Sequence, residues 1–171
     1  SPLHAGTGHA ADIIDLPIAR MKATQIPFVP GSSIKGVLRD ARSGEGLDRV
    51  RAVFGPDDDP SKHAGALVVG DARLLALPVR SFWGTFAWVS SPLLLALAAR
   101  DLGKTAPTAP SLPAGRVARV AAGSVCARQG RLYLEDLDLP ASEDGGVAEW
   151  ARSLAPLASP GTDILTGRFV V

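Results

Sequence analysis

The clearest structural signal is GTFAWVSSPLLLALAARDLG, residues 84–103, because its hydrophobic pattern changes period halfway along. Residues 84–91 alternate between small or polar and bulky apolar side chains, which predicts a strand. From Pro92 onward apolar residues follow one another. Proline is favoured in the first turn of a helix, and Gly103 is placed to end it. The segment therefore predicts a strand that leads directly into a helix.

Similar signals recur along the chain. Residues 66–80 fit either a buried strand or a bent pair of strands, with Gly70 at the bend. A turn is expected at Gln129–Gly130. Helices alternating with strands, and hairpin signals late in the chain, predict a mixed α+β sheet of the split βαβ kind. The other predicted elements are helices at 32–41, 47–55 and 146–157 and strands at 116–125, 131–139 and 164–171.

The composition is that of a globular protein. Of the 171 residues, 46% are hydrophobic and 20% are charged, which is enough apolar material for one domain with a substantial core. The single cysteine, Cys126, excludes an internal disulfide and fits a reducing compartment. The longest apolar runs, such as residues 92–99, are much shorter than the ~20 residues of a membrane span. We therefore expect a cytoplasmic protein without a membrane partner.

Charge is unevenly distributed, although the formal net charge is only +1. Residues 100–131 hold six Lys or Arg and one Asp, a net of +5, whereas residues 132–163 hold seven Asp or Glu and one Arg, a net of −6. Two interpretations are open. The first stretch presents a basic surface to a partner, or the two stretches neutralise one another in the fold.

A second informative segment is VPGSSIKGVLRD, residues 29–40. Pro30–Gly31 forms a turn, and Ser32 is placed to cap the helix that follows. Lys35 and Arg39 are four residues apart, so their side chains can converge on one ligand. A helix N-terminus with free amides, hydroxyls and a nearby cation is suited to an anion, although the spacing is not that of a P-loop. The alternative is a capped surface helix with solvated cations.

Three segments, taken in order, carry a family resemblance. They are SPLHAGTG with IIDLPIAR in residues 1–20, IPFVPGSSIKGVLRD in 26–40, and GALVVGDARLLALPVRSFWGTFAWVSSPLLL in 65–95. Together they resemble the repeated backbone subunit of the type III-B CRISPR effector, the Cmr complex, within the RAMP superfamily. Each segment alone is a weak signal, whereas PGSSIKGVLR followed by GDARLLALPVRS is specific. The charged segments after residue 100 match less clearly.

The resemblance implies a ferredoxin-like (RRM-like) palm with inserted loops and subdomains, folded as a single RAMP domain over residues 1–171. Residues 1–103 would form the palm core, with a catalytic loop at 4–20 and an RNA-binding turn and helix at 29–41. Residues 104–145 would form an inserted hairpin subdomain. Family members continue further at both ends, so this chain is expected to lack N- and C-terminal flanks.

The same resemblance implies an activity and partners. Copies of the subunit stack into a filament along the guide crRNA, together with other Cmr subunits. Each copy cuts the paired single-stranded target RNA, for antiviral defence. The cutting aspartate lies in the loop before the PIxR segment, which here is Asp15, with Mg²⁺ as the implied cofactor. The residues implied to bind the guide backbone are Ser32, Ser33, Lys35 and Arg39.

The chemistry expected at Asp15 takes two forms. An RNA strand is cut when its 2′-hydroxyl attacks the adjacent phosphate in line, so a carboxylate there is either a ligand of Mg²⁺ or the base for the 2′ proton. Asp12 either assists or is a turn residue. His4 is a second catalytic candidate. Its alternatives are to contact the RNA, to position the loop, or to be only a packing or turn residue. Arg20 contacts a phosphate or an acid of a neighbouring subunit. Where the family often carries an acidic residue, this sequence has Met21.

Other functions compete with RNA-guided cleavage. They are a structural RNA-binding backbone whose partners cut, the type III-A counterpart, and a guide-processing ribonuclease that uses His4 as a base without metal. The Cys and His residues lack zinc spacing, so a structural zinc is not expected. Arg80 is expected to be structural. Trp83 and Trp88 are expected in the core or an interface, because stacking on bases needs exposed rings.

Overall fold

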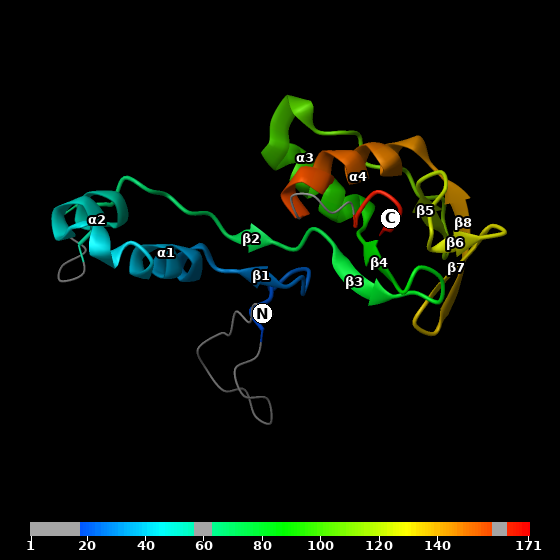
Figure 1. The fold of residues 1–171 in the computed structure, drawn as a ribbon, viewed down its shortest axis with the longest axis horizontal. Coiled ribbons are helices and arrows are strands. Elements are labelled where there is room, and N and C mark those ends of the chain that lie inside the picture. Colours follow the sequence, from blue (N-terminus) through cyan, green and yellow to red (C-terminus); the bar gives the residue numbers. More distant parts are fainter. Residues whose placement is uncertain (1–17, 57–62, 159–163) are drawn as a thin grey trace, which may run out of the picture. The chain divides into compact units, whose positions relative to one another are not determined.

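The computed structural model describes residues 18–56, 63–158 and 164–171. The chain divides into two compact units, Ser1–Leu74 and Leu75–Val171 (Figure 1). Within the described residues, no helix has the length and apolar character needed to cross a membrane. The expected single RAMP domain, with its palm core and an insertion at 104–145, stays a prediction.

The first unit is a pair of short helices closed by a two-stranded ladder. Residues Phe28 and Val29 pair antiparallel with Arg73 and Ala72, so the chain returns to where it entered the helices. After the second helix, the amide of Leu67 donates to the carbonyl of Val53 at 2.8 Å, which ties the returning segment to the end of that helix. The elements are β1 (Phe28–Val29), α1 (Gly31–Asp40), the 3₁₀ helix η1 (Ser43–Glu45), α2 (Leu47–Phe54) and β2 (Ala72–Arg73).

The second unit is a curled sheet with two helices on one side. The strand order is β3-β4-β9-β5-β8-β7-β6, in which β4 with β9 and β5 with β8 are parallel pairs and the other pairs are antiparallel. Its elements are β3 (Leu77–Arg80), β4 (Phe86–Val89), α3 (Pro92–Leu102), η2 (Gly103–Thr105), β5 (Ala118–Val120), β6 (Ala127–Arg128), β7 (Arg131–Leu134), β8 (Leu137–Glu143), α4 (Gly145–Ala158) and β9 (Phe169–Val170).

The sheet curls until its first strand meets β7. Ser81, just after β3, forms a bridge with Leu134, and the amide of Phe82 donates to the carbonyl of Tyr133 at 3.1 Å. This closure encloses a small apolar core between the strands. Its buried members are Ala87, Ala118, Val120, Cys126, Leu132, Leu134 and Val170.

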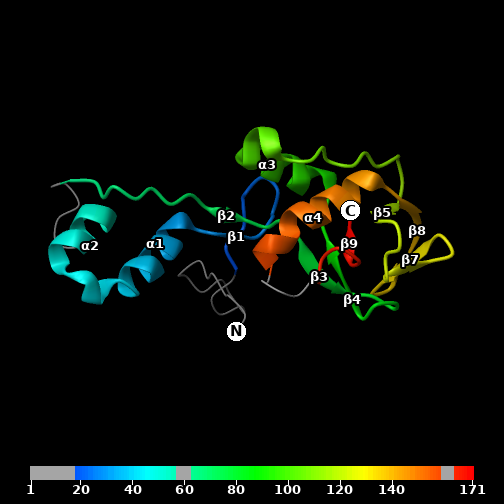
Figure 2. The same cartoon turned by 45° about the horizontal axis from the view of Figure 1, so that its top comes forward.

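The helices α3 and α4 cover the other side of the central strands, and Figures 1 and 2 show them lying together there. Leu95 of α3 and Trp150 of α4 are fully buried with Phe169 of β9. The indole nitrogen of Trp150 donates to the carbonyl of Thr108 at 3.0 Å, so its one polar atom is satisfied inside the core. Two helices packed on one face of a sheet confirm the predicted α+β class, and the arrangement is consistent with a ferredoxin-like palm.

The segment at residues 84–103 folds as its pattern predicts. β4 is followed by α3, with Pro92 at the first helical position. The hydroxyl of Ser91 accepts from the amide of Leu94 at 3.3 Å and so caps the helix, and Gly103 ends it with a positive φ of 69°. Every signal needed for this part of the fold is therefore local.

The structure corrects one sequence prediction about strands and decides between two alternatives for another. Residues 131–139 form two strands rather than one, because the chain turns at Glu135–Asp136 and Leu137 pairs with Leu134. Residues 66–80 form the bent alternative, with β2 and β3 assigned to different units, and Val68 is 90% exposed rather than buried in a strand. The turn expected at Gln129–Gly130 is confirmed, with both φ angles positive.

The charged stretches neutralise one another at one pair of strands. Arg131 of β7 donates from Nε to Oδ1 of Asp138 of β8 at 2.9 Å, and this bond raises the pKa of the arginine above its ordinary value. Arg128, also in the basic stretch, is exposed. Neutralisation is therefore confirmed at this pair of strands, and a basic surface for a partner stays a prediction.

Cys126 is fully buried in the enclosed core, where its thiol donates to the carbonyl of Phe86 at 3.3 Å. Burial raises the pKa of this thiol above its ordinary value. Above that ordinary pKa the unfolded chain loses the thiol proton first, so the free energy of unfolding falls as pH rises, and below it the thiol contributes no pH dependence. We expect the native thiol to react with a thiol reagent at least about tenfold more slowly than the unfolded thiol.

The measurement is the labelling rate at pH 8 with and without denaturant, together with unfolding curves at pH 8, 9 and 10. The Cys126→Ala variant is the control, because it lacks the thiol. Its free energy of unfolding should fall less between pH 9 and 10 than that of the parent protein. Rapid labelling of the folded protein would contradict the burial of Cys126.

Candidate nucleic-acid interface

The N-terminus of α1 is held by close backbone packing and one carboxylate. Gly31 opens the helix and is buried, and a Cβ at this position would lie 2.3 Å from the carbonyl oxygen of Val69. The Gly31 amide donates to Oδ1 of Asp71 at 2.8 Å. Asp71 thus supplies the negative charge that a helix N-terminus attracts.

Ser32 is not the N-cap that the sequence predicts. Pro30 holds the N-cap position without a side-chain hydrogen bond, and its carbonyl accepts from the amides of Ser33 at 3.0 Å and Ile34 at 3.2 Å. Ser32 therefore lies in the first turn, and both Ser32 and Ser33 are exposed. Because capping is done elsewhere, these two hydroxyls remain as donors for a ligand.

The two cations of α1 differ in their contacts. Arg39 donates from Nη2 to the carbonyl oxygen of Gly55, at the end of α2, which places its charge at the negative end of that helix. Lys35 is half-buried and makes no ion pair with any residue in the described part of the chain. Since Lys35 is three residues after Ser32, it lies on the same side of the helix. Among the described residues, no acid neutralises its charge beside the serine hydroxyls.

Arg20 lies before β1, at the base of a turn that leads into it. Its Nη1 donates to the carbonyl oxygen of Gln25 at 2.9 Å, and its backbone forms a bridge with Pro27. The side chain is exposed. Arg20 therefore holds the turn closed and still faces solvent.

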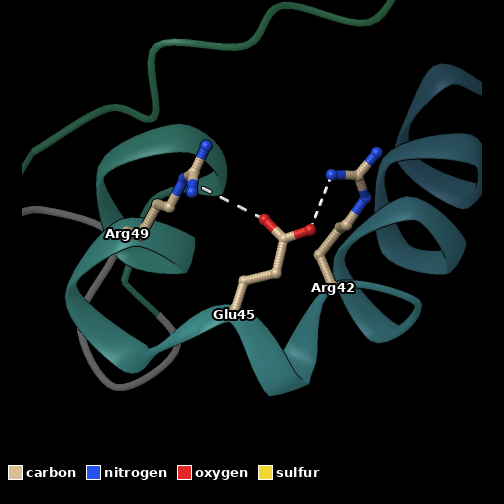
Figure 3. A network of polar contacts seen from close by, with 3 residues as sticks. All are labelled: Arg42, Glu45 and Arg49. Carbon is tan, nitrogen blue, oxygen red and sulfur yellow. Dashed lines mark hydrogen bonds and ion pairs between the residues drawn. The ribbon is translucent and has the colours of Figure 1, made fainter.

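A second cationic feature lies where η1 joins the two helices, and the sequence interpretation missed it. Glu45 accepts from Nη1 of Arg42 at 2.7 Å and forms a looser ion pair with Nε of Arg49 at 3.9 Å (Figure 3). They line a hollow of about 270 Å³ whose apolar walls include Leu38, Val50, Val53, Phe54 and Leu67. A count of charged residues over 18–56 would have revealed this feature. That segment contains seven Lys or Arg and three Asp or Glu, a net charge of +4.

The residues predicted to cut RNA, Asp15 and His4, lie outside the described residues. The neighbouring Asp12 lies outside them too. In the described ranges, no group of three or more His, Cys, Asp or Glu side chains is arranged to hold a metal ion. Arg80 is exposed at the end of β3, Trp83 is half-buried, and Trp88 packs against the core under α3 and α4.

Comparison with known proteins gives a consistent result. The profile of the RAMP superfamily matches residues 1–147. The CRISPR system Cmr endoribonuclease Cmr4 of Pyrococcus furiosus is 41% identical over 106 residues, which is 60% of this chain and 36% of that protein. The expected resemblance to the type III-B Cmr backbone subunit is confirmed.

Solved structures agree with the sequence comparison. Oligomeric Cmr4 from Pyrococcus furiosus superposes with a TM-score of 0.79 at 27% identity, over 99% of this chain and 64% of that chain. A type III-B Cmr-beta structure bound to cognate target RNA has a TM-score of 0.60 at 19% identity, over 82% of this chain and 55% of that chain, and shows the shared fold alone. The chain thus spans 36% of the curated relative and 64% of the oligomeric Cmr4 chain.

Proposed function

Because the chain belongs to the RAMP superfamily, we propose that it is a crRNA-binding backbone subunit of a type III-B CRISPR effector. The observation that carries this proposal is the pair of exposed hydroxyls, Ser32 and Ser33, beside the available charge of Lys35 at the start of α1. Hydroxyl donors and a cation at a helix N-terminus suit a phosphate oxygen. The Gly31 amide already donates to the carboxylate of Asp71, so it is not a donor for the phosphate. A phosphate would therefore bind to the hydroxyls of Ser32 and Ser33. Arg39 and Arg20 are the further proposed contacts.

The proposed partners follow from this assignment. They are the guide crRNA, the paired single-stranded target RNA, further copies of the chain in a filament, and the other Cmr subunits, all in the cytoplasm. One Cmr4 structure similar to this chain is oligomeric, which supports the filament. A backbone subunit binds the ribose-phosphate chain and leaves the reading of sequence to base pairing.

The proposed reaction is endonucleolytic cleavage of the target RNA at Asp15. The 2′ oxygen loses its proton and forms a bond to the adjacent phosphorus while the bond to the 5′ oxygen breaks. The products are a 2′,3′-cyclic phosphate and a 5′-hydroxyl whose oxygen takes a proton from water. The carboxylate takes the 2′ proton or holds Mg²⁺, with His4 as the second candidate. When bound, Mg²⁺ would stabilise charge on the phosphate. The match to a Cmr endoribonuclease supports this reaction.

The RNA-binding part of the proposal is tested by Lys35→Gln. Removing one phosphate contact should weaken binding of guide RNA about five- to tenfold at low salt. It should also reduce the slope of log K against log salt by about 0.7, the value for one contact on a single strand. The measurement is a salt titration by fluorescence anisotropy.

Lys22→Gln is the matched control, because it removes the same charge from the first unit at an exposed lysine that lies before β1 and outside α1. Lys22→Gln should change the affinity for guide RNA and the salt slope less than Lys35→Gln does. Equal effects of the two substitutions would mean that only net charge matters, and the site at α1 would then be rejected.

A further inference from the structure

Three aromatic rings gather where the closing edge of the sheet meets β7. The ring centroids of Phe82 and Trp83 are 5.6 Å apart, those of Trp83 and Tyr133 are 5.2 Å apart, and those of Phe82 and Tyr133 are 6.2 Å apart. All three pairs meet edge to face. Phe82 is nevertheless 79% exposed, so its neighbours fix the ring without covering it. We call these three residues the aromatic platform.

The aromatic platform lies on the outer side of the curled sheet. In β7, Leu132 and Leu134 are buried in the enclosed core, so Tyr133 between them points the other way. Ser81 is buried at the closure and Phe82 follows it as an exposed residue. The backbone bond from Phe82 to Tyr133 holds the two rings on this face.

Two arginines accompany the rings. The guanidinium of Arg128 lies 5.9 Å from the centre of the Trp83 ring. Arg80 is exposed two residues before Phe82, and neither arginine has an acidic partner among the described residues. Arg131, by contrast, is paired with Asp138. The acidic turn at Glu135–Asp136 follows Tyr133 by two residues and limits the basic surface on that side.

We propose that the aromatic platform stacks an unpaired base of single-stranded RNA on Phe82, while Arg80 and Arg128 contact its flanking phosphates. The inference rests on the proposed RNA-binding function and adds a second contact in the other unit. Exposed aromatic rings on a sheet surface, accompanied by cations, are the groups that bind single-stranded RNA. Arginines without an acidic partner in the described part of the chain favour a polyanion over an apolar protein surface.

The test compares two strands of equal length and charge, an oligouridine and its abasic ribose-phosphate analogue. Phe82→Leu keeps an apolar side chain but removes the ring, and should weaken oligouridine binding about tenfold. It should leave binding of the abasic strand unchanged. Phe82→Tyr keeps a ring and should restore most of the affinity. Leu93→Ala, at a residue 53% exposed on α3, is the control for loss of an exposed apolar group.

Each outcome decides the matter. Selective loss for oligouridine in Phe82→Leu, with rescue by tyrosine, supports the platform. If Phe82→Leu binds oligouridine as tightly as the parent protein, the aromatic platform is overturned. If Lys35→Gln still weakens binding in that case, the proposed function stands without the platform. Failure of the parent protein to bind either strand overturns both. If Phe82→Leu changes only self-association in sedimentation, the surface is a protein interface and the inference is wrong.

Discussion

Replacing Asp15 with asparagine is expected to abolish cleavage of guide-paired target RNA and to leave its binding unchanged. Asparagine keeps the size of the side chain but is neither a base nor a charged ligand for Mg²⁺. Loss of a positioned acid–base group typically costs about 10²- to 10⁴-fold in rate. Binding should persist because the proposed guide contacts, Ser32, Ser33 and Lys35, lie on α1.

The measurement is cleavage of a labelled target by a complex assembled with guide RNA and Mg²⁺, next to target binding under the same conditions. Asp12→Asn removes a carboxylate three residues earlier and tests whether that residue assists cleavage or only turns the chain. If the regularly spaced cuts remain in Asp15→Asn, the subunit is a structural backbone or cuts with another group, of which His4 is the first to test. Full activity in a chelator would remove the metal from the proposal.

The second large effect concerns the glycine at the start of α1. Gly31→Ala should destabilise the first unit by about 2 to 3 kcal/mol, because backbone must move to admit the new methyl group. A Cβ at Gly31 would lie 2.3 Å from the carbonyl oxygen of Val69 and 2.9 Å from two backbone atoms of Gly70. If the backbone of Gly31 moved away from residues 69–70, the hydrogen bond between the Gly31 amide and Asp71 would also lengthen. Guide-RNA affinity should fall with it, because Ser32 and Ser33 shift.

Gly36→Ala, in the middle of the same helix, is the matched control. A Cβ at Gly36 meets nothing within 4 Å, so alanine there should stabilise α1 by up to about 1 kcal/mol. Both variants are compared by chemical unfolding followed by circular dichroism. Similar stabilities of the two variants would show that the 69–70 segment does not pack against Gly31.

Sequence patterns were sufficient where the signals are consecutive. β4 and α3 follow from one change of period, and Ser91, Pro92 and Gly103 mark the helix ends within a few residues. They were insufficient at 131–139, because leucines continue beyond Glu135–Asp136 with their alternation shifted by one residue. That shift, together with two adjacent acids, is the signal that predicts a hairpin there.

The site shows the same division. Its residue types, two serines and a lysine at the start of a helix, and the family resemblance were present in the sequence itself. Their availability was decided by tertiary structure. Asp71, 40 residues away, bonds the Gly31 amide and Pro30 holds the N-cap position, which leaves the serines exposed, while Gly55 engages Arg39. Local pattern sets which groups a helix end contains, because neighbours in sequence share its geometry. Which of those groups stay open to a ligand depends on where the chain returns, and only the folded backbone sets that.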